Sequence, residues 1–592
     1  MSNFLQRAKH FVLHRDVIFY LSFILIAFLV HLEFLMHGWL FAANDQQFHL
    51  QRIYELYQNI VHGNLNPLIA TYTFNNNGNA VMSLYPKWPA YVYAVCQLIT
   101  KNPINAIYFG NIIKTALELS VAFYSVRIIG RNKLTAYLFA LLYSASFMII
   151  AYDYQTMDLG AMWGLVWLPL IYSGFYKWIK EDKWVSLSIG LSGLLLNHIL
   201  SFGVVIISLI FLTLFNFSYI KSLKKWVSLL KGAILTVLLS SLTWVPIVYF
   251  TFFSSEKYQV PSVPFGLQGS SLASIFEFSA ISNSTMYLGL ASALSLILCI
   301  INYNNMTREQ KQLFFLSILF VLLQSPLVPW QKLQGTPFSV IQFPWRLLIV
   351  PMVCLDYLLV VNFLYLIRES LKNKRTVKAV GALGTVILVS CIMLRYHEII
   401  QSQIVNPEVN YQITPQRGLP MQNDLHTYKI TNIYEYQNML GYNNSWDYYP
   451  FVTANNGTTL PRIIQHLGFN LNTGKSFPVN FQAIPEGIKF NFQTSAKSTN
   501  MELPFVAYDH HYQVFLDGHP TKWILSSSAV IQLNNVSRGK HNVLIKYQNM
   551  SLKQAMTFPS FAGLLFLILL PFKKYFYLDQ KNRKSKRESP HK

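Results

Sequence analysis

Apolar runs about as long as a lipid bilayer is thick recur along this chain, and they restrict its fold more than any other feature. The first run, VIFYLSFILIAFLVHLEFLM at residues 17–36, has the roughly 20 apolar residues that a helix needs to cross a membrane. Only 12% of the residues are charged, whereas soluble domains carry about 25%. We therefore expect a polytopic α-helical membrane protein.

The basic residues lie between the apolar runs and mark one side of the membrane. The net charge of +22 comes largely from the loops at residues 131–133, 177–183, 221–225, 308–311 and 368–378, and from the tail KNRKSKRESPHK. Short basic loops are typical of the cytoplasmic face. The charge therefore indicates topology and attraction to anionic membrane lipid, and it gives no support to nucleic acid as a partner.

Placing the basic loops inside predicts twelve spans in the plasma membrane, with both termini cytoplasmic. We expect these spans near residues 17–36, 105–128, 134–151, 160–177, 184–198, 201–217, 228–251, 284–302, 313–328, 343–366, 379–395 and 556–572. The first run is longer than the apolar core of a signal peptide, so we expect it to be retained. The run PKWPAYVYAVCQLIT at 86–100 would break the alternation of sides if it crossed. We expect a short buried helix there.

Three pieces are expected on the extracytoplasmic side, at residues 37–104, 252–283 and 396–555. The third contains the alternating runs GIKFNFQT, HYQVFLDG, AVIQLNNV and HNVLIKYQ, with DGHP and SRGKH as expected hairpin turns. We expect a small antiparallel β-sandwich without disulfides, because all four cysteines lie in apolar runs. The predicted division is a transmembrane domain at 1–395, a β-rich domain at 396–555, and a last helix with a basic tail at 556–592.

A row of polar residues begins the first outer loop, in the stretch NDQQFHLQRI at residues 44–53. On a helix, Asp45, His49 and Arg52 share one face. A separate apolar stripe consists of Leu50, Ile53, Tyr54, Tyr57 and Val61. We expect this helix to lie along the membrane surface with its stripe down and its polar row facing the bundle.

The start of this helix has two interpretations. Asn44 is expected to cap it, with Gln47 completing a capping box, which leaves Asp45 in the first turn where the helix dipole favours its ionised form. Asp45 could then act as a general base or a metal ligand beside a membrane cavity. Alternatively, Asp45 only begins the helix, and His49 and Arg52 are its solvated neighbours.

This stretch and three others carry a family resemblance. The others are YTFNNNGNAVMSLYPKWPAYVYA at 72–94, LNHILSF at 196–202 and IQFPWRLL at 341–348. Together with the span pattern they resemble the GT-C superfamily of membrane glycosyltransferases. More narrowly, they resemble bacterial YfhO-like proteins and the membrane proteins named as 6-pyruvoyl-tetrahydropterin-synthase-related. The resemblance implies a GT-C-like bundle, a sugar donor linked to polyprenyl phosphate, and an essential aspartate after the first span, here Asp45.

One segment departs from the family pattern. Relatives often have an arginine and a glutamate around the start of the fourth span, whereas this chain has AYDYQTMDLGAMWGLVWLPL. Asp158 could replace that carboxylate and share a metal with Asp45, or the activity could be changed or lost. Asp153 and Asp158 could equally be helix caps and solvated loop charges at the interface.

Two more polar residues stand at the expected outer ends of spans. His198, next to Asn197, could contact a substrate phosphate or only hydrogen-bond the turn between two spans. Arg346 could hold a lipid phosphate through two hydrogen bonds, or snorkel to the interface. The candidate substrate- and phosphate-binding residues are therefore His49, Arg52, Asp158, His198 and Arg346, and Lys87 is a further candidate for a phosphate contact.

The chemistry implied by the resemblance needs few groups. Asp45 would take the proton of an acceptor hydroxyl on a cell-envelope polymer such as teichoic acid. Arg346, a divalent cation such as Mg²⁺ or Mn²⁺, or both would stabilise the departing phosphate. Direct displacement would invert the anomeric centre, as the family implies. No GxGxxG or Walker motif supports a nucleotide site.

Two other functions compete with the enzyme. The first is a transporter or flippase for a lipid-linked saccharide, since transporters often place charges in the middle of the membrane. The almost charge-free centres of the expected spans favour the enzyme. The second is a non-catalytic envelope assembly protein, in which the outer β-rich domain does the work.

Overall fold

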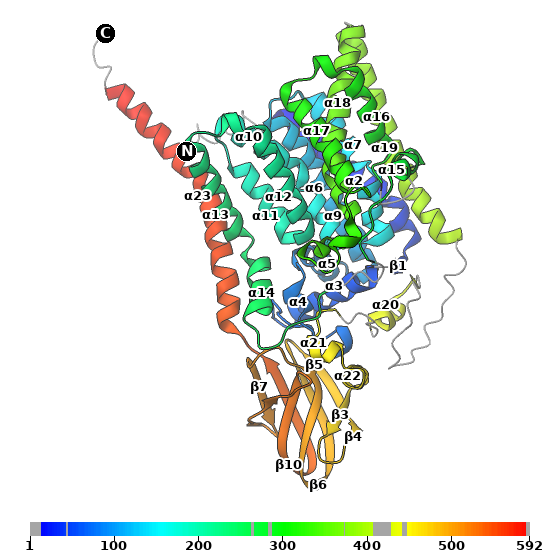
Figure 1. Ribbon diagram of the computed structural model, residues 1–592, viewed down its shortest axis with the longest axis vertical. Helices are drawn as coiled ribbons and strands as arrows, with labels where there is room; N and C mark the ends of the chain where they lie inside the picture. The colour runs from blue at the N-terminus through cyan, green and yellow to red at the C-terminus, as the bar shows by residue number, and fades with distance from the viewer. Residues whose placement is uncertain are drawn as a thin grey trace.

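A bundle of long helices forms one end of the protein and a β-rich domain forms the other, with the short helices α3, α4 and α21 between them (Figure 1). The computed structural model describes residues 14–42, 45–261, 266–281, 287–371, 373–405, 428–440 and 447–587. All four cysteines fall in these ranges and none forms a disulfide, as expected.

Five helices in the described part of the chain are long and apolar enough to cross a membrane, and up to eight crossings result if each bent pair counts as one. The five comprise α2 (His14–His37), α6 (Pro103–Ile128), η8 with α18 (Pro344–Leu348 and Ile349–Leu371), α19 (Lys374–Val405) and α23 (Met550–Arg587). These helices agree with a membrane protein, but the twelve spans expected from the sequence are not confirmed.

Three expected spans are pairs of helices joined at a sharp bend. The pairs are α7 (Lys133–Ser144) with α8 (Phe147–Ala151) and η3 (Tyr152–Thr156), α9 (Leu159–Leu165) with α10 (Leu168–Glu181), and α13 (Leu223–Leu239) with α14 (Ser241–Phe252). Their bends are 48°, 40° and 75°. An apolar run gives the length of a buried segment but does not show where its axis turns.

Four other expected spans are single helices of only 12–17 residues, namely α11 (Val185–Asn197), α12 (Ile199–Phe215), α16 (Leu290–Ile301) and α17 (Arg308–Leu323). At 1.5 Å per residue they reach about 18–26 Å, which is less than the roughly 30 Å of a bilayer core. Shorter elements complete this part of the chain: η4 (Phe217–Tyr219), α15 (Leu272–Ile281), η5 (Tyr303–Asn305), η6 (Trp330–Leu333) and η7 (Pro337–Ile341).

The first long loop folds as a layer beneath the bundle. It contains β1 (Leu40–Ala42), α3 (Gln46–Val61), η2 (Phe74–Asn76), α4 (Val81–Leu84) and α5 (Trp88–Thr100). His49 and Arg52 of the polar row lie on α3, and Asp45 directly precedes it. The apolar stripe is only partly covered, because Val61 at its end is exposed. Leu50 and Ile53 are buried in protein, because α3 packs against α5 and α20 (Ile433–Leu440). As expected, α5 is too short to be a candidate span.

The β-rich domain is one antiparallel, barrel-like sheet of eight strands in the order β4-β3-β6-β10-β7-β8, with β5 paired to β6 and β9 to β10. The strands are β3 (Leu467–Asn470), β4 (Lys475–Pro478), β5 (Asn480–Ile484), β6 (Gly487–Val506), β7 (Tyr512–Leu516), β8 (His519–Pro520), β9 (Ile524–Leu525) and β10 (Val530–Tyr547). Before it come β2 (Tyr428–Ile430), which pairs with β1, and the helices α21 (Phe451–Ala454) and α22 (Thr459–Ile464).

The antiparallel strands agree with the sequence pattern, but the two-sheet sandwich was wrong. The strands β6 and β10 are 20 and 18 residues long and pair along most of their length, which joins all the strands into one sheet. The hairpin turn at DGHP is confirmed, since Asp517 and Gly518 have φ values of 51° and 84° between the paired residues Leu516 and His519. SRGKH is no turn, because a shift of register at Ser537 to Gly539 lets β10 continue through it.

Candidate functional site

A break in the bundle brings Asp158 next to the first loop. The chain leaves α8 through a π-helical turn, Tyr152–Thr156, and Met157 then takes a left-handed φ of 49°. Asp158 caps α9, because its side chain accepts a hydrogen bond from the backbone N–H of Ala161 at 3.1 Å. Such π-helical turns often occur at functional sites.

Gly160 allows this segment to pack closely against the first loop and α12. A Cβ atom at Gly160 would lie 2.7 Å from the Tyr85 hydroxyl and 3.0 Å from Cδ2 of His198. The Tyr85 hydroxyl donates to Asp158 Oδ1 at 3.1 Å. The missing side chain therefore leaves room beside this segment for the Tyr85 hydroxyl and the His198 ring.

Asp158 is buried and forms the centre of the cluster. Its Oδ1 accepts from Tyr85 and Ala161 and lies 3.6 Å from Nε2 of His49, whereas its Oδ2 accepts no hydrogen bond from the described residues. Burial opposes ionisation of Asp158. The close contact with Nε2 of His49 and the neighbouring groups of His198 and Arg346 outweigh that effect and hold its pKa well below the usual range.

Arg52 fixes the orientation of His49. Its Nη1 lies 3.1 Å from Nδ1 of His49, and a guanidinium can only donate, so Nδ1 accepts and the proton of the neutral ring sits on Nε2, toward Asp158. Burial lowers the pKa of His49, which favours this neutral form. Nη2 of Arg52 donates to the carbonyls of Tyr85 and Pro86, and the Arg52 guanidinium lies 4.3 Å from the centre of the Tyr85 ring. Arg52 is fully buried, so its placement supports a positioning role instead of the phosphate contact we expected.

Asp45 is the residue immediately before α3. It occupies the N-cap position, but its carboxylate makes no capping hydrogen bond and accepts none from any described side chain. The expected cap, Asn44, lies outside the described residues. The side chain of Asp45 reaches solvent, and nearby protein atoms still remove part of its hydration. Burial by that protein, followed by the charges of Asp158 and Asp447, raises the pKa of Asp45 to about 6, and Arg346 opposes this rise.

Arg346 supplies a cation with unused donors. Its Nη1 donates to the carbonyl of Ile341 at 3.0 Å and to Oε1 of Gln342 at 2.7 Å. Its Nε and Nη2 make no hydrogen bond with the described residues, and the side chain is only half-buried. It is close enough to influence the ionisation of both Asp45 and Asp158. A guanidinium with free N–H groups can hold a phosphate.

His198 joins α11 to α12 and also borders the cluster. Its Nδ1 accepts from the backbone N–H of Ser201 at 3.4 Å and contacts the Ser201 hydroxyl at 2.7 Å, so the ring caps α12. The ring still lies close enough to Asp158 for the two groups to influence each other's ionisation. The structure thus brings Asp45, His49, Arg52, Asp158, His198 and Arg346 into one cluster.

Tyr85 and Glu55 are supporting residues whose contacts the sequence did not reveal. Glu55 is buried and accepts from the backbone N–H groups of Thr71, Tyr72 and Thr73 at 2.8–3.0 Å, which ties α3 to the following loop. The sequence gives one hint of this role for Glu55, namely that a carboxylate stands among the residues of α3 that face the protein interior. Lys87 is also buried and donates to the carbonyl of Pro67 at 2.6 Å, so its placement does not favour a phosphate contact.

A second group of charges lies inside the helix bundle and corrects our expectation of nearly charge-free span centres. Lys114 Nζ is 2.7 Å from Asp153 Oδ1 and 2.8 Å from Glu118 Oε2, and all three side chains are buried. The Tyr396 hydroxyl donates to Asp153 Oδ2 at 2.6 Å. Asp153 is therefore a partner of Lys114 within the bundle, not a solvated loop charge.

The residues of the cluster fit a divalent cation only in part. Among the described residues, no three His, Cys, Asp or Glu side chains are arranged to hold a metal ion. Asp45 and Asp158 offer two carboxylates, but the Nε2 of His49 carries a proton and so cannot add a third ligand in this tautomer.

The described architecture comprises several helices that could span a membrane, a barrel-like β-rich domain, and a polar cluster where α3, the start of α9 and the junction of α11 with α12 meet. No protein-family model matches this chain, and no curated protein matches it either. The chemistry of the cluster is therefore the feature that points to a function.

Proposed function

We propose that this protein is a membrane glycosyltransferase of the GT-C type, which transfers a sugar from polyprenyl phosphate to a cell-envelope polymer such as teichoic acid. One observation carries the proposal: the unpaired carboxylate of Asp45 lies within electrostatic reach of Arg346, whose Nε and Nη2 have no partner among the described residues. A base and a phosphate-binding cation are the two groups that this transfer requires.

In the proposed reaction, the acceptor hydroxyl oxygen attacks the anomeric carbon of the sugar. Its proton passes to Asp45, the bond between that carbon and the phosphate oxygen breaks, and polyprenyl phosphate leaves with the electron pair. Arg346 binds the phosphate as its charge develops. With a pKa of about 6, Asp45 is mostly ionised at pH 7 and is a stronger base than an ordinary aspartate. A direct displacement of this kind inverts the anomeric centre.

Asp158, His49 and Arg52 would hold the geometry. Arg52 sets the tautomer of His49, His49 and Tyr85 hold Asp158, and the negative charge of Asp158 contributes to the raised pKa of Asp45. If a Mg²⁺ or Mn²⁺ ion takes part, Asp45 and Asp158 would be its protein ligands, and the ion would add positive charge at the leaving phosphate. Removal of divalent cations with a chelator tests that part separately.

The proposed topology places the basic loops and both termini in the cytoplasm, and the cluster and β-rich domain outside the plasma membrane. It rests on the basic loops and the positive-inside rule. A total of twelve crossings requires the short helices α11, α12, α16 and α17 each to cross. Reporter fusions at residues 130 and 480 test the orientation, and a cytoplasmic reporter at 480 would contradict it.

The test of function is transfer of labelled sugar from polyprenyl phosphate to cell-wall polymer in membranes that contain the protein. We expect transfer by the natural chain and a large loss in Asp45→Asn. The wall polymers of a deletion strain should lack the transferred sugar. Unchanged polymers together with no transfer would favour the assembly role of the β-rich domain.

A transporter of a lipid-linked saccharide is the second candidate, because of the buried charges of Lys114, Glu118 and Asp153. Buried charges of this kind often mark transport pathways. A flipping assay in vesicles separates the two functions. If the protein is a transporter and these charges form its pathway, Glu118→Gln should abolish flipping. If the protein is a glycosyltransferase and the charges only stabilise the bundle, Glu118→Gln should keep sugar transfer in open membranes.

A further inference from the structure

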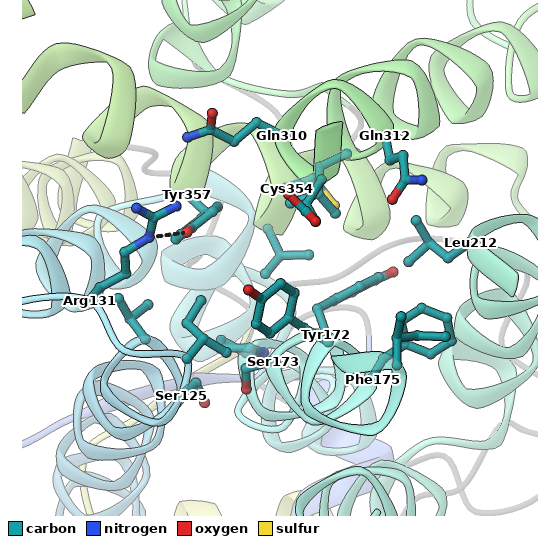
Figure 2. A pocket seen from close by; sticks show the side chains of 18 of the residues that line it. Ser125, Arg131, Tyr172, Ser173, Phe175, Leu212, Gln310, Gln312, Cys354 and Tyr357 are labelled. Atoms are coloured by element: carbon teal, nitrogen blue, oxygen red, sulfur yellow. Dashed lines mark hydrogen bonds between the residues drawn. The ribbon is translucent and has the colours of Figure 1, made fainter. Parts of the chain in front are cut away.

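A cavity of 380 Å³ lies among helices α6, α7, α10, α12, α17 and α18, separate from the Asp45 cluster (Figure 2). This volume is within the range of roughly 300–1,000 Å³ that is typical of ligand sites. Helix α6 begins at Pro103, next to α5, whereas the cavity is lined by Ser125 and Val126 near its other end. At 1.5 Å per residue, the cavity therefore lies about 33 Å along α6 from its start at Pro103.

One positive charge in the wall of the cavity is not neutralised. Arg131 Nε donates to the Tyr357 hydroxyl at 2.9 Å, as Figure 2 shows, and its Nη1 and Nη2 make no hydrogen bond with the described residues. The other lining cation, Lys180, pairs with Glu309 at 2.6 Å. The lining therefore carries one net positive charge, on a guanidinium with two free nitrogens.

The rest of the wall is neutral. The amides of Asn216 and Gln312 hydrogen-bond each other in both directions at 3.0 and 3.2 Å, and the Tyr172 hydroxyl lies 2.7 Å from that of Ser208. The apolar part of the lining includes Phe139, Phe175, Leu212, Leu313 and Val353. A ligand that matches this lining has one anionic group and an apolar body.

We propose that this cavity binds an anionic phospholipid, with its phosphate on Arg131 and part of an acyl chain against the apolar wall. Two of the lining helices, α6 and α18, are candidate membrane spans, so the cavity lies within the proposed membrane domain. Positively charged pockets between transmembrane helices suit phospholipid head groups. A guanidinium that has two free nitrogens can bind a phosphate through two parallel hydrogen bonds.

The test measures the thermal unfolding of the full chain in a neutral detergent. Phosphatidylglycerol, phosphatidylcholine or glycerol 3-phosphate is added over a range of concentrations. Phosphatidylglycerol should raise the unfolding temperature most, because a ligand that binds only the folded state stabilises it. Arg131→Gln should weaken the apparent affinity for phosphatidylglycerol by about tenfold or more, as expected for a lost charge-assisted hydrogen bond.

Lys183→Gln is the matched control, because its side chain is 68% exposed, pairs with Glu181 and does not line the cavity. It removes the same charge and should leave the affinity unchanged. Leu212→Phe is the second variant; it keeps Arg131 but fills the cavity, and it should also reduce the stabilisation. Equal stabilisation by the two phospholipids, or an Arg131→Gln variant that responds like the natural chain, would overturn the proposal. If glycerol 3-phosphate stabilises the protein as much as phosphatidylglycerol does, the ligand of this cavity is not a lipid.

Discussion

Replacement of Asp45 by asparagine is the sharpest test of the proposed chemistry, because it removes the negative charge and changes the size of the side chain very little. The carboxylate makes no capping hydrogen bond, and asparagine is as good an N-cap residue, so we expect folding and membrane level to be kept. A lost general base lowers rates by roughly 10²–10⁴-fold. The matched control is Asp517→Asn, which makes the same change in a turn of the β-rich domain and should keep full activity.

The pH dependence adds a second, signed test of Asp45. Burial and the charge of Asp158 raise its pKa to about 6, and only the ionised form can accept a proton. Transfer should therefore be nearly constant above pH 7 and should fall about tenfold per pH unit below pH 6. The Asp45→Asn variant should lose this acidic limb, because no group titrates at that position.

The assay is transfer of labelled sugar from polyprenyl phosphate to wall polymer, measured in membranes between pH 5 and pH 8. Protein level in each membrane preparation is measured in parallel, so that a loss of rate is separated from a loss of protein. A normal rate in Asp45→Asn would refute the role of this carboxylate as the base. An acidic limb near pH 4 in the natural chain would refute the raised pKa of Asp45.

The other predictions concern the groups around Asp45. Asp158→Asn should move the acidic limb of sugar transfer to lower pH, and Arg346→Gln should move it to higher pH, because their charges act on Asp45 in opposite directions; limbs that stay in place would contradict this coupling. Gly160→Ala should cost about 1–3 kcal/mol of stability, measured by thermal unfolding, because its Cβ would meet Tyr85 and His198, and an unchanged stability would refute this close packing. Glu55→Gln should lose roughly 1–3 kcal/mol, because an amide nitrogen would face the N–H groups of the following loop; unfolding at the natural temperature would contradict it.

The sequence predicted local properties of this protein well. Apolar runs indicated a membrane protein, and helices long enough to cross a bilayer are present. Alternating residues predicted antiparallel strands, and the DGHP turn lies where the pattern placed it. Residue type and position also selected His198 and Arg346 as candidates, because polar groups at the ends of apolar segments are costly unless they have partners or functions. Asp45 and Asp158 became candidates chiefly through the family resemblance.

Only the tertiary structure decided which residues meet. Asp45, Asp158, His198 and Arg346 come from four distant segments, and the place of Asp158 depends on a π-helical turn and on the space at Gly160. The same is true of Arg52, which looks like a solvated neighbour of Asp45 on a helix but is buried against Tyr85 and Pro86. Periodicity reports which face of one segment is apolar. It carries no information on where a helix bends or which side chains from other segments fill that face, because long-range packing decides both.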